Sequence, residues 1–236
     1  MEKLLLMFLF YFITINVGEC QTENNYLNRL AFLDGDRFTC IGVLLSPRHA
    51  LFNGNCVQRR NFTDHGKLGV FARDVYSDTI EKTATNYRNV VAAAYESDCK
   101  IKLGSSRIQN CFVVLTLESD FEVGNDIQVT KLPTSPITEN TLGFIFGWHN
   151  KCTTRSDQRI VVANISVVAR NMCADLQADE FCAMDTMTER IHSSSPVISG
   201  DTIIGFTTVG CHYSTNTNPV TDLYLHAGFL KSHVSV

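Results

Sequence analysis

The chain has 236 residues, of which 44% are hydrophobic and 19% are charged, and its mean hydropathy is zero. This composition excludes a disordered or collagen-like chain, and the length is enough to bury a core in one large domain or two small ones. The net charge is −4 and no basic run occurs, which argues against nucleic acid as a partner.

The N-terminal residues have the pattern of a secretory signal peptide. A short charged start precedes an apolar run over Leu4–Ile13, and small residues follow at Gly18 and Cys20. The apolar run is shorter than the roughly 20 residues that a membrane-spanning helix needs. We therefore predict a signal peptide over residues 1–20, cleaved after Cys20 or after Gly18, and a secreted mature chain over residues 21–236 without a membrane anchor.

The mature chain then shows short apolar or alternating runs separated by turn-rich stretches. Runs of this length without a 3.6-residue period predict β-strands in a sandwich or barrel. No linker or internal repeat divides the chain, so we expect one compact β unit or two packed barrels. The predicted strands are Leu27–Leu33, Cys40–Leu45, Leu68–Ala72, Val90–Tyr95, Phe112–Leu117, Ile127–Leu132, Leu142–Phe146, Arg159–Val168, Pro196–Ile198, Thr202–Thr208 and Leu223–His226.

Helix signals are few. We expect a helical turn at Ala50–Cys56, a short helix near Val168–Leu176 and a C-terminal helix over Gly228–Val234, whereas Ser214–Pro219 has the composition of a turn.

Cysteine usage agrees with secretion. Nine cysteines occur in the full chain, and removal of Cys20 with the signal leaves eight, an even set typical of a disulfide framework with 105 possible pairings. The chain has no CxxC motif and no Cys/His pair with the spacing of a zinc site, so we expect no metal and no cofactor. Secretion would also make Asn61 and Asn164, each in an Asn-X-Ser/Thr sequon, glycosylation sites.

Motifs along the first half resemble those of one enzyme family. The segment Cys40–Cys56 resembles CGGSLISPRxVLTAAHC, in which two cysteines bracket a strand and the turn with a catalytic histidine. Cys111–Leu117 resembles DIALLKL, which carries a catalytic aspartate, and Lys131–Pro133 resembles the later CLP. These are motifs of the trypsin-like serine proteases.

The second half continues the resemblance in the same order. Phe146–Trp148 resembles GWG, Phe181–Ala183 resembles FCAG, and Ser193–Ile198 resembles the SGGPLV of the nucleophile loop. Gly205–Cys211 resembles GIVSWGxGC, and Leu223–Ala227 resembles VYTRV.

The resemblance implies a fold and its domain organisation. It implies an all-β fold of two packed six-stranded antiparallel barrels with a short C-terminal helix. The single protease-like domain would cover residues 21–236, with an N-terminal barrel over about 21–125 and a C-terminal barrel over about 126–236.

The catalytic positions depart from the family pattern. Carried over residue by residue, the general-base histidine becomes Asn55, whose amide cannot accept a proton near neutrality. The aspartate becomes Cys111 (Asn110 one residue off), and neither residue offers a carboxylate. Only the serine is kept, at Ser193, and a serine without a base is a poor nucleophile. The seven histidines are candidates for a replacement base, although we expect none to serve.

The activation and binding positions depart as well. The family matures by a cut before IVGG, and the new ammonium group pairs with the aspartate preceding the serine. This chain has no IVGG, and the aspartate position holds His192. The oxyanion-hole glycine is replaced by Ile191, and the base of the specificity pocket falls at Met187.

Within this framework the eight cysteines are assigned to four disulfides. The resemblance implies Cys40–Cys56 and Cys173–Cys182. The other four cysteines are expected to pair as Cys152–Cys211 and Cys99–Cys111.

Taken with its departures, the resemblance implies a secreted, catalytically inactive serine protease homologue. Such a protein would bind extracellular proteases, inhibitors or cascade components. One alternative is an active serine endopeptidase that uses Ser193 with a non-standard base. Another is a heparin-binding module, for which Arg59-Arg60 and Lys100/Lys102 offer only small basic clusters against a net charge of −4.

Overall fold

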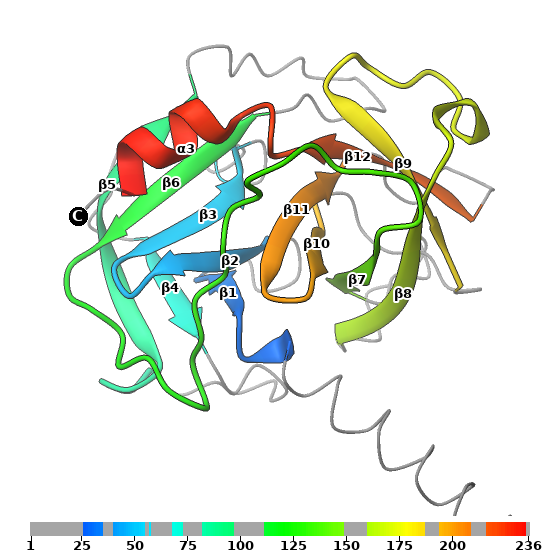
Figure 1. Ribbon diagram of the computed structural model, residues 1–236. Helices are drawn as coiled ribbons and strands as arrows, with labels where there is room; N and C mark the ends of the chain where they lie inside the picture. The colour runs from blue at the N-terminus through cyan, green and yellow to red at the C-terminus, as the bar shows by residue number, and fades with distance from the viewer. Residues whose placement is uncertain are drawn as a thin grey trace, which may run out of the picture.

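The computed structural model describes residues 26–34, 40–54, 57, 68–72, 82–96, 111–148, 160–186, 194–208 and 216–234. These residues form two closed antiparallel β-barrels that follow one another along the chain (Figure 1). The predicted fold of two six-stranded barrels is therefore confirmed.

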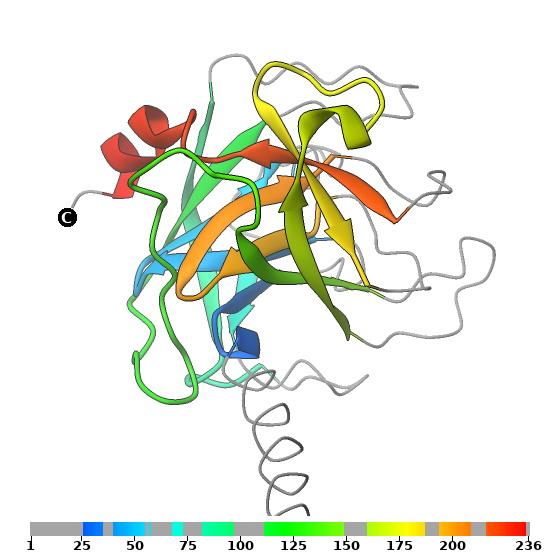
Figure 2. The same cartoon turned by 45° about the vertical axis from the view of Figure 1, so that its right-hand side comes forward.

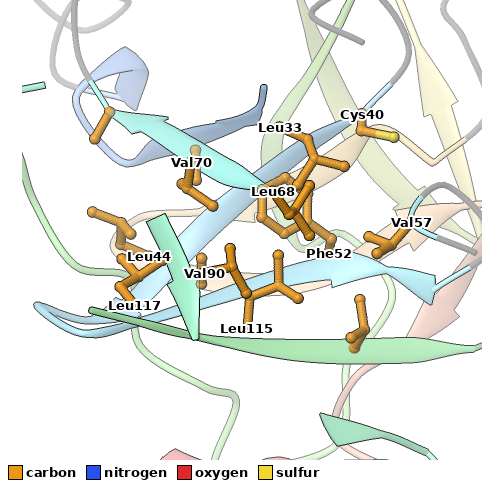
Figure 3. Packing of buried hydrophobic residues seen from close by; sticks show 14 of the residues in the cluster. Leu33, Cys40, Leu44, Phe52, Val57, Leu68, Val70, Val90, Leu115 and Leu117 are labelled. Carbon is orange, nitrogen blue, oxygen red and sulfur yellow. The ribbon is translucent and has the colours of Figure 1, made fainter. Parts of the chain in front are cut away.

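The first barrel is closed by strands in the order β1-β2-β3-β6-β5-β4. Its interior is apolar, and Leu44, Phe52, Leu68 and Leu115 are among the side chains that fill it (Figure 3). The strands are β1 (Leu30–Leu33), β2 (Ile41–Ser46), β3 (His49–Asn53), β4 (Gly69–Ala72), β5 (Tyr87–Tyr95) and β6 (Phe112–Leu117).

The second barrel repeats the same architecture in the order β10-β11-β12-β9-β8-β7. In β8 buried and more exposed residues alternate, as expected where one strand face lines the barrel interior. The strands are β7 (Leu142–Trp148), β8 (Ile160–Val168), β9 (Glu180–Asp185), β10 (Pro196–Ser199), β11 (Thr202–Thr207) and β12 (Thr217–Asp222).

A third apolar cluster lies between the barrels and joins them. Phe112 at the start of β6 packs against Phe206 of β11, with ring centroids 5.8 Å apart, and both side chains are fully buried. Strands β10 and β2 also touch at this junction, where the two barrels stand side by side (Figure 2). The C-terminal helix α3 (Ala227–Val234) leaves the second barrel, contacts β6 of the first, and buries Leu230 in the same cluster.

The helix predicted at Gly228–Val234 is thus confirmed. The helical turn predicted at Ala50–Cys56 is only partly right, because Ala50–Asn53 belong to strand β3 whereas Gly54 and Val57 are helical. Leu51 and Phe52 lie between two neighbouring strands and point into opposite apolar clusters, which explains the strand. The predicted strand Ile127–Leu132 is wrong: the segment begins with a bend at Ile127, and its ladder pairing is limited to an isolated bridge from Lys131 to Thr202.

The last strand lies earlier than predicted. Leu223–His226 forms a turn, and strand β12 covers Thr217–Asp222, which overlaps the segment predicted as a turn. Pairing on both sides, with β9 and β11, overrides the low strand preference of its asparagine and proline. Strand β9 was not predicted as a strand, although its Phe181–Ala183 motif was recognised.

The turn after β12 offers a matched test of the packing between the barrels. Leu223 is fully buried in the cluster between the barrels, whereas Leu225 is 58% exposed. We expect Leu223→Ala to lower the free energy of unfolding by about 2–5 kcal/mol, because it leaves a cavity in the joint. Leu225→Ala should change it by less than about 0.5 kcal/mol. Chemical denaturation of both variants measures the difference, and equal losses would contradict this account of the joint.

Candidate active site

The end of β3 and the start of β6 meet at the predicted positions of two catalytic residues. Asn53 pairs with Phe112, and the Gly54 amide donates a hydrogen bond of 2.6 Å to the Cys111 carbonyl. The chain therefore lies beside Cys111 at Gly54, the residue before Asn55. Cys111 is 1% exposed and its sulfur is in a disulfide.

Several predicted residues lie outside the described part of the chain. Cys40 is also in a disulfide, but the partners expected for it and for Cys111 are not among the described residues. The predicted residues outside the description are Asn55, Cys56, Asn61, Cys99, Cys152, Met187, Ile191, His192, Ser193 and Cys211.

The nucleophile loop enters the described residues at Ser194. Its backbone has a φ of 69°, in the left-handed region that favours glycine, and the motif resemblance places the first glycine of SGGP here. The Ser194 amide donates to the Thr207 carbonyl at 2.8 Å, and the Ser195 amide donates to Thr207 Oγ1 at 3.0 Å. The loop thus keeps a glycine-type conformation that strand β11 holds in place, although the residue is a serine.

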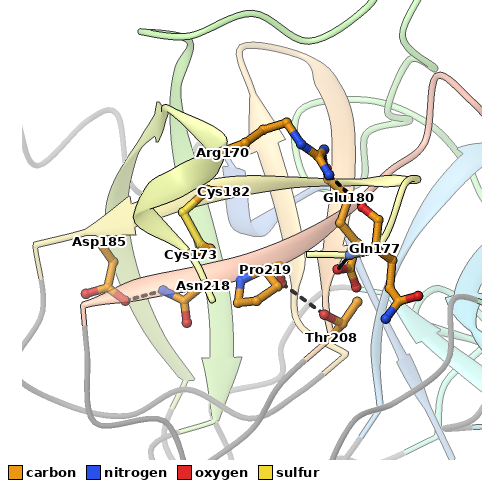
Figure 4. The surroundings of a disulfide bond; sticks show 9 residues. All are labelled: Arg170, Cys173, Gln177, Glu180, Cys182, Asp185, Thr208, Asn218 and Pro219. Carbon is orange, nitrogen blue, oxygen red and sulfur yellow. Dashed lines mark hydrogen bonds between the residues drawn. A yellow bond between two sulfur atoms is a disulfide. The ribbon is translucent and has the colours of Figure 1, made fainter. Parts of the chain in front are cut away.

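The disulfide Cys173–Cys182 supports the strand on the other side of the second barrel (Figure 4). It ties the residue after the 3-10 helix η2 (Arg170–Met172) to β9. The Arg170 guanidinium donates to the Gln177 and Glu180 carbonyls, so the turn between the two cysteines is also fixed by hydrogen bonds.

One histidine packs against Phe112, the residue after Cys111, and no motif in the sequence selects it for this place. The His226 ring packs edge-on against Phe112 at 4.9 Å between centroids. Its Nδ1 is 2.7 Å from Glu96 Oε1, and its Nε2 is 3.5 Å from Asp179 Oδ2, a distance that we treat as an ion pair. Glu96, Asp179 and His226 are far apart in the chain and carry no common motif, so only the fold brings them together.

The charge of His226 makes it unsuitable as a replacement base. Burial disfavours the charged ring, but the carboxylates of Asp179 and Glu96 outweigh this effect and raise the pKa of His226 to about 9. At neutral pH the imidazolium is already protonated and cannot accept a proton from a serine.

A second histidine does contact a serine, but away from the site. His49 Nδ1 is 2.8 Å from Ser46 Oγ in the hairpin between β2 and β3, and Oγ also accepts the Arg48 amide. Burial, followed by the charge of Arg48, lowers the pKa of His49. His49 is four residues from Asn53 along β3, about 13 Å at 3.3 Å per residue. The pair therefore belongs to the hairpin, at the far end of the strand from Cys111.

Within the described ranges, no group of three or more His, Cys, Asp or Glu residues is arranged to hold a metal ion. In the same part of the chain, no helix has the length and apolar character needed to cross a membrane.

Comparison with known proteins identifies the family. The family model described as Trypsin matches residues 15–227, which is most of the chain, so the protein belongs to the trypsin family. The match begins at Ile15, inside the predicted signal peptide. No curated protein matches the sequence.

Solved structures show the same fold at low sequence identity. Kallikrein-related peptidase 10 in complex with Zn²⁺ is 14% identical, covering 89% of this chain and 97% of its own, with a TM-score of 0.67. Neuropsin, a serine protease expressed in the limbic system of mouse brain, is 15% identical, and the match covers 90% of this chain and 96% of the neuropsin chain, with a TM-score of 0.67. At these identities the likeness establishes the fold alone.

The backbone of Ser194 gives a test of the loop geometry. Ser194→Gly should keep or raise the free energy of unfolding, by up to about 1 kcal/mol, because glycine adopts the left-handed region without steric cost. Ser195→Gly, at a neighbour without positive φ, should lower it by about 0.5–1 kcal/mol. Denaturant titrations compare the two, and a loss in Ser194→Gly as large as in Ser195→Gly would contradict the assigned conformation.

Proposed function

We propose that this chain is a secreted, catalytically inactive member of the trypsin family that acts by binding other extracellular proteins. The observation that carries the proposal is the state of Cys111, which the motif resemblance places where active members have the aspartate. Its sulfur is buried in a disulfide, so this position supplies no carboxylate to orient a histidine or stabilise its charge.

The chemistry of the remaining positions supports the same conclusion. Asn55 has no titratable nitrogen, so the hydroxyl of Ser193 would have no base beside it. Loss of triad function lowers turnover in such enzymes by roughly 10⁴ to 10⁶. His226 is protonated, and His49 is held in a distant hairpin, so neither of these two imidazoles is suited to replace the missing base.

The positions for activation and for oxyanion binding add independent defects. His192 cannot pair with an inserted ammonium group, because an uncompensated buried charge is costly. Ile191 is β-branched, and such residues strongly disfavour the backbone angles that aim an amide at an oxyanion. Met187 offers no charge to a basic substrate.

A binding role is what a rigid scaffold with surface loops can perform without chemistry. The binding partners that we propose are extracellular proteases, their inhibitors or other components of proteolytic cascades. Secretion follows from the predicted signal over residues 1–20. Glycosylation of Asn164 is compatible with its position, since its side chain is exposed on β8 and the intervening Ile165 points into the barrel.

Labelling with an active-site probe tests inactivity. Purified mature protein treated with a fluorophosphonate should label no more strongly than its Ser193→Ala variant, because the hydroxyl lacks a proton acceptor. Gel fluorescence measures the labelling, with active trypsin as the positive control.

A second variant makes the result specific. Labelling that is lost in Ser193→Ala and kept in Ser195→Ala would overturn the proposed inactivity. It would favour the alternative of a serine endopeptidase with a non-standard base.

Expression in a secreting eukaryotic cell tests the proposed location and modification. The protein in the medium should begin at Gln21 or at Glu19, and peptide N-glycosidase should lower its mass. Asn61→Gln and Asn164→Gln should each remove one glycan, and Ser166→Ala should reproduce the effect of Asn164→Gln, because it destroys the same sequon. N-terminal sequencing and intact mass measure both features, and retention of the unprocessed chain inside the cell would contradict secretion.

A further inference from the structure

His226 lies at the place where the two barrels approach each other. Its Nδ1 contacts Glu96, which follows β5 of the first barrel, and its Nε2 faces Asp179, which precedes β9 of the second. The ring rests on Phe112, the residue that also packs across the joint on Phe206. One side chain therefore contacts a carboxylate of each barrel at the edge of the apolar joint.

The backbone holds the same two carboxylates in place. The Glu96 amide donates to the Phe112 carbonyl at 3.0 Å, and the Asp222 amide donates to the Asp179 carbonyl at 2.8 Å. These bonds anchor the main chain of Glu96 and Asp179 beside the strand ends. The position of His226 is itself fixed, because its amide donates to the Leu223 carbonyl and the helix α3 begins directly after it.

The charges around the ring are acidic. Glu96 and Asp179 contact it, and Asp222 of β12 is a third carboxylate. Burial raises the pKa of Asp222, and the charge of His226 offsets part of this rise. Phe112, from β6, contributes no charge. Loss of the proton from His226 would remove the positive charge that Glu96 and Asp179 both contact.

We propose that His226 is a proton-dependent clasp between the two barrels, which strengthens the apolar joint while the ring is charged and loses this contribution in alkaline solution. The proposal is independent of whether the protein is an active protease. It adds a regulated joint to the scaffold on which the proposed binding surface would be presented.

The direction of the pH dependence follows from the linkage between protonation and folding. The pKa of His226 is about 9 in the folded protein, above the value of 6.5 for an unperturbed histidine. The clasp therefore contributes its full stability below about pH 6.5, and this contribution is lost as the pH rises through about 9.

Titration of the histidine rings by NMR tests the charge directly. In the wild-type protein one imidazole should titrate above about pH 8. Glu96→Gln should lower that value by at least about one pH unit, because it removes the nearest anion. His226→Gln identifies the resonance by its loss, and the exposed His233 on α3 serves as the internal reference, which Glu96→Gln should leave unchanged.

Thermal unfolding between pH 6 and pH 10 tests the clasp itself. At pH 6.5 the wild-type protein should melt roughly 3 °C or more above His226→Gln. This difference should shrink toward zero by about pH 10, when the ring has lost its charge. His233→Gln should follow the wild-type curve at every pH.

Hydrogen exchange shows whether loss of His226 weakens the joint between the barrels or the whole protein. The amides of Glu96 and Asp222 should lose protection in His226→Gln at pH 6.5, relative to amides inside either barrel. A ring that titrates near or below pH 6.5 would overturn the proposal. A gap between wild type and His226→Gln that persists unchanged to pH 10 would do the same. If His226→Gln does not fold, the titration of the wild type and of Glu96→Gln still decides the question.

Discussion

The apolar joint between the two barrels is the constraint on which the rest of the structure depends. Each barrel closes on its own interior, but Phe112 of the first and Phe206 of the second are fully buried only because they face each other. This contact places the start of β6 beside β11, whose Thr207 holds the loop at Ser194. The segments that would carry the aspartate and the serine in an active relative are therefore brought together by packing. They stay together whether or not the residues that do chemistry are present.

Much of this architecture could be predicted because it follows from local patterns in the sequence. The strand at Phe112–Leu117 and the helix after Ala227 follow from apolar runs and from the order of recognisable motifs. The placement of β12 could not be predicted, because Thr217–Asp222 contains an asparagine and a proline and becomes a strand only through its two neighbours. The helical turn predicted at Ala50–Cys56 includes Ala50–Asn53, which form a strand through pairing with β2 and β6. Glu96 and His226 are 130 residues apart in the sequence, so no local sequence pattern indicates their contact.

The trypsin fold and the trypsin reaction make separate demands on a sequence. The fold needs buried strands and a left-handed backbone just before β10, and the chain keeps both, the latter at Ser194. The reaction needs a base, an acid and an amide aimed at an oxyanion, and those depend on a few side chains that contribute little to the core. Cys111 illustrates the difference, because a buried disulfide sulfur suits the packing at the start of β6 and cannot perform the task of a carboxylate.

The same reasoning explains why a charged histidine is tolerated beside that site. A buried ionised group destabilises a protein unless partners compensate its loss of hydration, and His226 has carboxylates from both barrels together with the face of an aromatic ring. At neutral pH an imidazole with this pKa could not act as a general base, because a base works best when its pKa lies close to the pH of the solution. Beside Phe112, the residue after Cys111, the chain thus places a charged group that contacts a carboxylate of each barrel. That arrangement fits the proposed role of the chain as a scaffold that presents a binding surface.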